Sequence, residues 1–265
     1  MIATRQERPV ARSGRTLWPR EHGAYFQLAL PLLTVGARRA PSLAVMLLAL
    51  AAVAAFLAHE PWLVVLGHRG PRRRVEDGPR ARTRLLLLAS AAIGLGVAGL
   101  AISPRGTVAA AAIIAVPVAV AIGCGYRRVA HTLAGELVAV VALTGASFVV
   151  QVAGGVARGA ALDAWLGWSL GFAASTIAVH RVIARHKHAA SWVDRVCALV
   201  LAGGFAACLW RATPGGAFAI AAPLVGLAAV VVAAPPSARR LRAIGLATVA
   251  AGTLAGVLAT LATVP

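Results

Sequence analysis

Long apolar stretches alternate with short polar segments along the 265-residue chain. Most stretches hold roughly 18 to 22 residues, about the length that an α-helix needs to cross a hydrocarbon core of ~30 Å. Reading these stretches against the intervening Gly, Pro and Arg residues predicts nine spans. They cover residues 22–37, 42–66, 84–102, 106–124, 133–154, 161–182, 192–211, 216–233 and 241–262. The pattern therefore predicts an all-α fold, a polytopic transmembrane helix bundle.

The first span is short and contains Pro31. Proline removes a backbone hydrogen bond, so we expect this segment to be kinked or partly re-entrant. Small residues inside other spans, such as Gly252 and Gly256, predict close packing between helices. No repeat is evident beyond the helix-loop alternation. The chain is therefore predicted to hold a basic cytosolic tail at residues 1–20 and one transmembrane helical domain at residues 21–265.

The composition agrees with a membrane protein. Hydrophobic residues make up 60% of the chain, charged residues make up 13%, and the mean hydropathy is +0.81. A soluble domain has about 25% charged residues, so an ordinary cytosolic enzyme is excluded. The cysteines, Cys124, Cys197 and Cys208, lie inside apolar stretches and form no C-x-x-C pair. Neither a disulfide framework nor a zinc ribbon is therefore implied.

The net charge of +18 is concentrated at one membrane face. With nine spans and a cytosolic N-terminus, all but five of the 26 basic residues fall on the cytosolic side; the five are Arg38, Arg39, Arg105, Arg158 and Arg211. This asymmetry follows the positive-inside rule and places the C-terminus on the opposite side. No aromatic side chains interleave with the basic residues, so membrane lipid headgroups fit them better than nucleic acid, which is not an expected partner.

Histidine and acidic residues also gather on the cytosolic side, although membrane insertion requires no such asymmetry of them. All seven histidines, and every acid except Asp163, fall on the cytosolic side. Ionisable side chains at membrane depth are costly unless they face a cavity or a partner, so those at the helix ends are candidate site residues. Function is therefore expected at the cytosolic end of the bundle.

Residues 18–25 open the first span with three consecutive ionisable side chains, Arg20, Glu21 and His22, followed by small residues. Glu21 sits where the start of a helix favours a negative charge. The small residues would let a ligand or a partner helix come close. The plainer interpretation is an interfacial cap with a snorkelling arginine and a tryptophan anchor.

The second span ends on His59, Glu60 and Pro61. Pro61 permits a break, which would leave His59 and Glu60 near a helix end. Both are candidates for catalysis, since a carboxylate and an imidazole can exchange protons with a substrate. In the alternative interpretation Glu60 pairs with a nearby loop arginine, and His59 is a satisfied interface histidine.

Glu136 lies one turn into the fifth span, five residues after His131. Apolar sequence follows it, and burial would raise the pKa of the carboxyl group or demand a cationic partner. We expect a functional carboxylate here. The alternative is a structural ion pair with Arg20, Arg127 or Arg128.

The sixth span ends with His180, Arg181 and Arg185. The two arginines lie one turn apart on one helix face, where they could together hold an anionic headgroup or a phosphate. With Arg20 and Glu21 they form the predicted substrate-binding set, and His180 is a catalytic candidate. As topology signals alone, the arginines would need no ligand.

No familiar catalytic signature occurs: Walker A, H-E-x-x-H and G-x-S-x-G sequences are all missing. The nearest approach to a metal site is an assembly of His22, His59, Glu60, Glu136 and His180, drawn from four spans at a shared membrane depth. A divalent metal is the one cofactor that this set suggests, and the sequence names no particular ion.

Three short segments resemble YwiC-like proteins, a bacterial membrane family of unestablished function. They are Arg20-Glu21-His22-Gly23-Ala24-Tyr25 with the following Pro31-Leu32-Leu33, the His59-Glu60-Pro61 end of span two, and the Gly135-Glu136-Leu137 start of span five. The opening motif of that family usually reads H-G-A-W, and Tyr25 stands here in place of the tryptophan. The resemblance covers most of the chain loosely and implies a multi-pass protein of a bacterial inner (plasma) membrane.

Nine spans with polar residues at the cytosolic ends of spans two and six also look like UbiA-type prenyltransferases. Those enzymes bind a prenyl diphosphate through magnesium that two Asp-rich motifs hold. This chain departs from the pattern: His59 and Glu60 occupy one place, His180 and Arg181 the other, and neither N-D-x-x-D nor D-x-x-x-D occurs. The resemblance thus implies an architecture and a lipid-type substrate, and it does not imply the magnesium-diphosphate chemistry.

We therefore expect a cytosol-facing, lipid-accessible polar pocket that binds or transforms an amphipathic small molecule. In an enzyme, Arg20, Arg181 and Arg185 would hold the head of the substrate, and Glu60 or Glu136 with a histidine would act as acid–base groups or metal ligands. Two other classes stay open: a small-molecule or ion transporter, and a non-catalytic membrane scaffold. Transporters usually place ionisable groups or broken helices near the bilayer midplane, where this sequence is mostly apolar.

Overall fold

The computed structural model describes residues 17–19, 22–38, 41–186, 217–234 and 240–261, together with the single positions 203 and 237. Every regular element within these residues is a helix. They are α1 (His22–Arg38), α2 (Leu43–Val65), α3 (Pro71–Ala101), α4 (Arg105–Tyr126), α5 (Leu133–Ala153), α6 (Arg158–His186), α8 (Ala217–Ala233) and α9 (Leu241–Leu261). The predicted all-α bundle is confirmed. The predicted span 192–211 lies, apart from position 203, outside the described residues.

The helices are apolar along most of their length. Six of them, α2, α3, α4, α5, α6 and α9, are long and apolar enough to cross a membrane. The apolar parts of α1 and α8 are shorter, at Gly23–Gly36 and Ala219–Ala233. Large apolar side chains on α3 and α4 are well exposed, as at Leu87 and Val116. Such surfaces are stable when they face lipid, and the chain is a multi-pass membrane protein.

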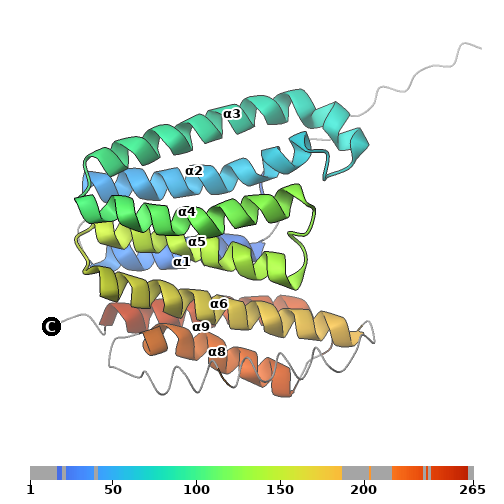
Figure 1. The fold of residues 1–265 in the computed structure, drawn as a ribbon. Coiled ribbons are helices and arrows are strands. Elements are labelled where there is room, and N and C mark those ends of the chain that lie inside the picture. The colour runs from blue at the N-terminus through green and yellow to red at the C-terminus, as the bar shows by residue number, and fades with distance from the viewer. Residues whose placement is uncertain are drawn as a thin grey trace, which may run out of the picture.

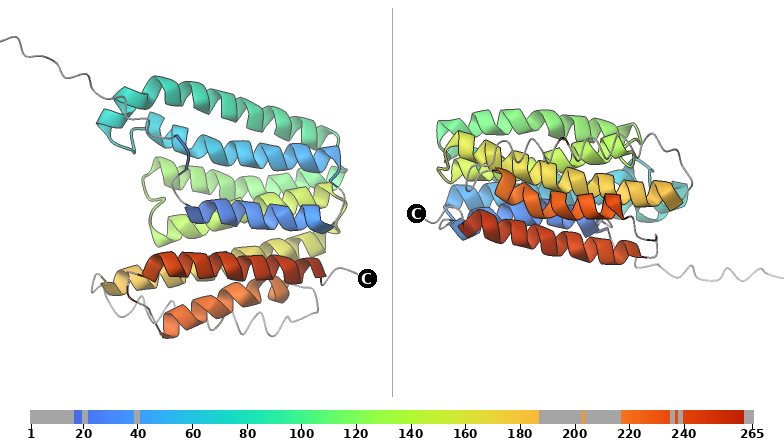
Figure 2. Two further views of the ribbon diagram at one scale, coloured as in Figure 1. Left: turned by 180° about the vertical axis from the view of Figure 1, so that it is seen from behind. Right: turned by 90° about the horizontal axis from the view of Figure 1, so that it is seen from below.

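The helices lie side by side in one elongated bundle (Figure 1). Helix α3 forms one edge and packs along α2, while α8 packs against α6 and α9 at the other edge. Helix α5 is central and contacts α1, α2, α4 and α6. Helix α1 packs between α5 and α9, which Figure 2 shows from behind. The first part of the chain thus meets the last helix across the bundle.

One end of the bundle carries most of the described arginines. At this end α2 and α4 finish and α3 and α5 begin, so we call it the basic end and define it by residues 65–71 and 126–133. Helix α1 begins here, and α9 finishes at the opposite end (Figures 1 and 2). The candidate site residues on α2, α5 and α6 all belong to this end.

Small residues let the helices approach closely, as their distribution predicts. A Cβ added to Gly171 on α6 would lie 2.7 Å from Leu224 Cδ1 on α8. One added to Gly252 on α9 would lie 2.7 Å from Leu30 Cδ1 on α1. Real Cβ atoms essentially never come so near, so the leucine side chains would have to move if either glycine carried a side chain.

The basic segment before the third span is mainly helical, so the helix is longer than the apolar stretch that predicted it. Helix α3 begins at Pro71, well before the predicted start at residue 84. Proline suits the first position of a helix, because its missing N–H would have no partner there. Two ion pairs with i,i+4 spacing follow: Arg72 Nε lies 2.6 Å from Glu76, and Arg73 Nε lies 3.3 Å from Asp77.

Prolines do not break the first two helices. Helix α1 is continuous through Pro31, where the Thr34 hydroxyl donates to the Pro31 carbonyl at 2.7 Å. Helix α2 passes through Pro61 and ends at Val65. A proline removes a single ladder bond, which packing within a bundle can offset. The partly re-entrant segment expected at Pro31 is therefore not found, and α2 does not make the break that Pro61 permits.

Candidate functional site

A cavity of about 670 Å³ opens among α1, α2, α4 and α5 near the basic end. Its walls are largely alanine, leucine, isoleucine and valine, with Leu85 of α3 and Thr176 of α6 at the margins. The polar side chains that line it include Gln27, His59, His131 and Glu136. Ligand pockets of about 300–1,000 Å³ commonly combine apolar walls with a few polar groups in this way.

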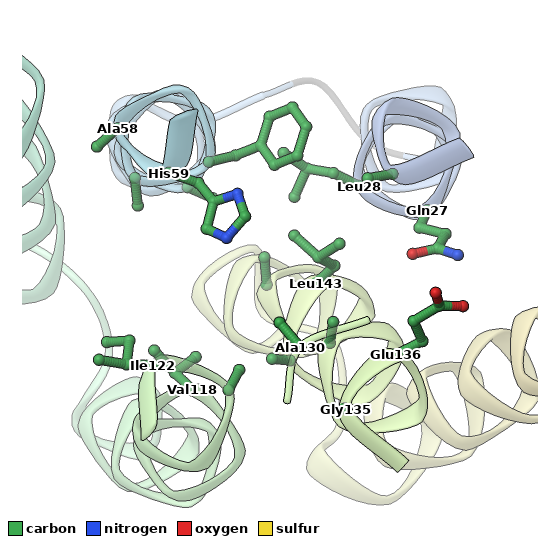
Figure 3. A pocket seen from close by; sticks show the side chains of 18 of the residues that line it. Gln27, Leu28, Ala58, His59, Val118, Ile122, Ala130, Gly135, Glu136 and Leu143 are labelled. Carbon is green, nitrogen blue, oxygen red and sulfur yellow. The ribbon is translucent and has the colours of Figure 1, made fainter. Parts of the chain in front are cut away.

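Glu136 stands in the first turn of α5, and local hydrogen bonds fix that turn. The Thr132 hydroxyl accepts from the Gly135 N–H at 3.2 Å, and the Thr132 carbonyl accepts from the Glu136 N–H at 2.9 Å. Threonine is a good N-cap because its side chain satisfies a backbone donor that the helix cannot. A carboxylate in the first turn is favoured by the partial positive charge there. Figure 3 shows Glu136 and Gln27 pointing toward one another across the gap between α5 and α1.

The loop between α4 and α5 folds tightly over the start of α5. A Cβ on Gly135 would lie 2.3 Å from the Val129 carbonyl oxygen and 2.8 Å from Ala130 Cα. The loop turns sharply because Arg128 adopts a φ of 63°, in the left-handed region that non-glycine residues seldom occupy. The Val129 N–H then donates back to the Cys124 carbonyl at 3.0 Å. This turn holds His131 at the end wall of the cavity.

Glu136 is paired with the histidine that the sequence singled out on α6. His180 Nδ1 lies 3.4 Å from Glu136 Oε2. Nδ1 is buried and has no hydrogen-bond partner at good geometry, so the contact is electrostatic and becomes an ion pair when the imidazole is protonated. The two side chains are about a third exposed, at 27% and 40%. A carboxylate and an imidazole in contact can pass a proton between them.

Helix α2 supplies the opposite wall. His59 points from α2 into the cavity, toward α4 and α5 (Figure 3). Its ring lies near Trp62, with 5.9 Å between ring centroids. One turn earlier, the rings of Phe56 and Tyr25 meet in a T-shaped arrangement at a centroid distance of 4.9 Å. The Tyr25 hydroxyl donates to the Pro19 carbonyl at 3.2 Å, so this pair ties α1 and the segment before it to α2.

Glu60 directly follows His59 but has a structural role in an ion-pair network. Its side chain is fully buried, and both carboxylate oxygens accept from the Arg69 guanidinium, at 2.5 to 3.2 Å. Arg73, which is 5% exposed, donates to Glu60 Oε1 at 3.1 Å and also faces Asp77. The Glu60 carboxylate thus fastens the end of α2 to the start of α3. It does not line the cavity.

The electrostatics of the basic end are positive. Burial lowers the pKa of His68, in the loop between α2 and α3, and the guanidinium groups of Arg128 and Arg69 lower it further. The guanidinium carbon of Arg84 lies 4.9 Å from the centre of the Trp18 ring. No arginine or lysine among the described residues lines the cavity itself. The cavity is therefore an apolar space with histidine and glutamate groups, set in a basic surround.

The structure brings together some of the predicted site residues and separates others. His59 and Glu136 line the cavity, and His180 contacts Glu136 from α6. Glu60 is held apart by its arginines, while Arg181 and Arg185 continue α6 beyond His180 without lining the cavity. His22 begins α1, its side chain is not among those described, and Arg20 and Glu21 lie outside the described residues.

A metal centre is not evident in the described part of the chain. Its side chains include no group of three or more His, Cys, Asp or Glu residues placed to hold an ion. The assembly suggested by membrane depth needed Glu60 beside His59 in the cavity, and Glu60 instead pairs with Arg69 and Arg73. A shared depth does not specify which helix face a side chain occupies.

Sequence reasoning missed several lining residues. His131 was noted as a histidine without being made a candidate, and Gln27 and Trp62 were given no role in a site. Gly135 carries a usable signal, since a glycine just inside a capped helix start points to a close backbone approach. For Gln27 the signal is weaker: it is a lone amide one turn into an apolar helix.

Comparison with known proteins confirms the family resemblance. The model of the YwiC-like protein family matches residues 18–152, more than half of the chain. The match contains α1, α2, α4 and nearly all of α5, which together form the main walls of the cavity. No curated protein and no solved structure matches the chain, so the UbiA-type likeness stays a prediction. The chain belongs to the YwiC-like protein family.

Proposed function

We propose that the cavity binds an amphipathic small molecule and that this binding is the function of the basic end. The observation that carries the proposal is an apolar space of about 670 Å³ with its ionisable groups gathered toward one end. Ala139, Leu143 and Ala146 continue along α5 from Glu136 toward the interior. An apolar tail fits these walls, and a polar head fits the end with His59, His131 and Glu136.

The same site is suited to proton-transfer chemistry on a lipid-type substrate. Glu136 and His180 would share or exchange a proton beside the head, while His59 offers a second imidazole. Arg20, Arg181 and Arg185 are assigned to an outer shell that attracts a charged head to the site. A UbiA-like enzyme is one form of this proposal, and it would have to work without Glu60, whose oxygens are occupied by two arginines.

We further propose that the basic end faces the cytosol across a bacterial inner membrane, with nine spans in all. The arginine asymmetry supports the orientation. Helix α6 ends at the basic end, whereas the start of α8, around Ile220, packs near Trp168 and Phe172, toward the opposite end. This arrangement fits a further crossing between them, and the residues concerned lie outside the described part of the chain.

A transporter is the second candidate, and the Glu136–His180 pair favours it, because coupled carboxylate and imidazole groups serve as proton relays in transporters. Transporter sites are commonly built on interrupted helices at the midplane. Here α1, α2, α4 and α8 contain prolines yet run without a break, which favours a binding pocket.

Filling the cavity tests the proposal. In Ala139→Phe we expect loss of the amphipathic molecule that co-purifies with the wild type in a mild detergent, measured by native mass spectrometry. Ala119→Phe is the matched control: it adds the same ring at an exposed position of α4 outside the cavity, and should retain the ligand. Equal ligand content in the two variants would refute the site.

Replacing the Glu136 carboxylate with an uncharged amide tests whether Glu136 binds the polar head of the ligand. A hydrogen bond to a charged group contributes about 1.5–3 kcal/mol, so Glu136→Gln should weaken binding of an isolated ligand by roughly tenfold or more. The measurement is a titration of the purified variant with that ligand. An unchanged dissociation constant would show that the head does not contact Glu136.

A further inference from the structure

The side of the cavity toward the bilayer lies between two helix pairs. Helix α3 packs along α2, and α4 packs along α5. The cavity separates α2 from α4, with Ala55 and Phe56 on one side and Val118 and Ile122 on the other. Figure 3 shows this arrangement, with Val118 and Ile122 on α4 facing the space into which His59 points. The cavity therefore lies along the boundary between the two pairs, with Leu85 of α3 at its margin.

The cavity walls continue into the outer surface at this boundary. Val118 and Ile122 line the cavity and are also 38% and 54% exposed. On α3, where Leu85 lines the cavity, the following Leu86 and Leu87 are each 67% exposed. A solvent-facing surface of this kind would be unfavourable, whereas hydrocarbon chains of the bilayer suit it.

The basic end of the cavity is more closely covered. The ring of Trp62 reaches from α2 to α4 and lies so near Gly125 that an added Cβ would be 2.6 Å from two of its atoms. The loop between α4 and α5 contributes Ala130 and His131 to the end wall, and backbone contacts at Gly135 hold this loop down. Polar groups and the indole thus cover the end, while the side between α2 and α4 is apolar.

The length of the cavity suits a hydrocarbon chain. Its lining on α2 runs from Ala52 to Trp62, and its lining on α5 runs from Gly135 to Ala146. At about 1.5 Å per helical residue, each run covers roughly 15 Å along the bundle. That is about half of a hydrocarbon core of ~30 Å, or one leaflet.

We infer that the ligand is a lipid of the bilayer leaflet at the basic end, and that its hydrocarbon chain enters the cavity sideways between α2 and α4. The inference rests on the proposed binding function and adds the chemical class and source of the ligand. Its head stays at the level of the headgroups, beside His59, His131 and Glu136. The contact of Trp62 with Gly125 closes the gap between α2 and α4 at the headgroup end.

Quenching of tryptophan fluorescence by brominated lipid tests whether a lipid chain enters the cavity between α2 and α4. The full chain is placed in nanodiscs whose phospholipid carries bromine on the part of the acyl chains nearest the headgroup, because bromine quenches an indole that it contacts and Trp62 lies at the headgroup end of the cavity. The emission of Trp62 is taken as the difference between the wild type and Trp62→Phe. We expect the brominated lipid to remove most of this emission.

A cavity-filling variant separates a chain inside the cavity from lipid around the protein. In Ala139→Phe the quenching of Trp62 should fall, because the added ring displaces the chain while the outer lipid contact of the indole is unchanged. Ala55→Leu, which narrows the cavity from the α2 side, gives a second and smaller substitution with the same expectation. Quenching unchanged in both variants would overturn the inference.

A water-soluble probe tests separately whether the ligand enters sideways from the bilayer and whether the cavity binds a ligand at all. If 6-bromohexanoic acid quenches Trp62 in the wild type and loses this effect in Ala139→Phe, while brominated phospholipid has no effect, the site binds amphiphiles from water and the sideways path is wrong. If neither probe responds to cavity filling, the proposed function fails along with the inference. Quenching by the phospholipid that cavity filling abolishes supports both.

Discussion

Replacing Glu60 with glutamine is expected to lower the free energy of unfolding by about 3 kcal/mol, because breaking a buried ion pair leaves an uncompensated charge. Both Glu60 oxygens accept from Arg69, and one accepts from Arg73. The loss should fall near the lower end of the range for buried pairs, since Arg69 retains 21% exposure and Asp77 still faces Arg73. Reversible unfolding in mixed micelles measures it.

The chain contains a matched control for this substitution. Glu76 pairs with Arg72 at 2.6 Å, but their side chains are 36% and 75% exposed. An exposed i,i+4 pair contributes little because water screens it, so Glu76→Gln should leave stability almost unchanged. Equal losses in Glu60→Gln and Glu76→Gln would contradict a structural role for the buried network. Ligand binding by the folded Glu60→Gln protein should persist, since Glu60 does not line the cavity.

Replacing Gly135 with alanine is expected to destabilise the protein by roughly 3 kcal/mol, the upper part of the usual range for overpacking. The new Cβ would lie 2.3 Å from the Val129 carbonyl oxygen and 3.0 Å from the Ala130 carbonyl carbon. Both are backbone atoms that cannot rotate away, so the loop or the start of α5 must move. We expect a lower unfolding temperature together with weaker ligand binding, because this loop holds His131 at the cavity.

Gly123→Ala is the control, and its expected change in stability has the opposite sign. Gly123 lies on α4 at the same end of the bundle, and an added Cβ would have nothing within 4 Å. Alanine is favoured over glycine in a helix by about 1 kcal/mol, so this variant should be as stable as the wild type or more so. A similar change in stability for both variants would show that the approach of the loop to α5 is not tight.

The helices could be predicted because their apolar lengths are set by the bilayer. Helix α5, for example, occupies Leu133–Ala153 where the pattern indicated residues 133–154. Helix α3 was predicted too short, since its first turns are polar and are stabilised by ion pairs that hydropathy does not register. The i,i+4 spacing of Arg72 and Glu76 is the sequence feature that indicates helix in these polar turns of α3.

The candidate site could be predicted only in part. Glu60 and Glu136 carry similar signals, each being a lone carboxylate near a helix end beside apolar sequence. They differ because the short hairpin between α2 and α3 brings two arginines to Glu60, while α1 and α6 bring Gln27 and His180 near Glu136. Which helices become neighbours depends on packing between segments far apart in the chain, and hydropathy does not specify it.

The most direct test of the binding pocket is a side-chain-resolution density map of the protein in lipid nanodiscs. A bound lipid should give elongated density in the cavity between α2 and α4, with its polar end beside Glu136 and its tail along Ala139 and Leu143. The same map of Ala139→Phe should lack that density. A cavity that holds only separate water-sized features, or that is closed by α2 packing onto α4, would show that it is not a lipid-binding pocket.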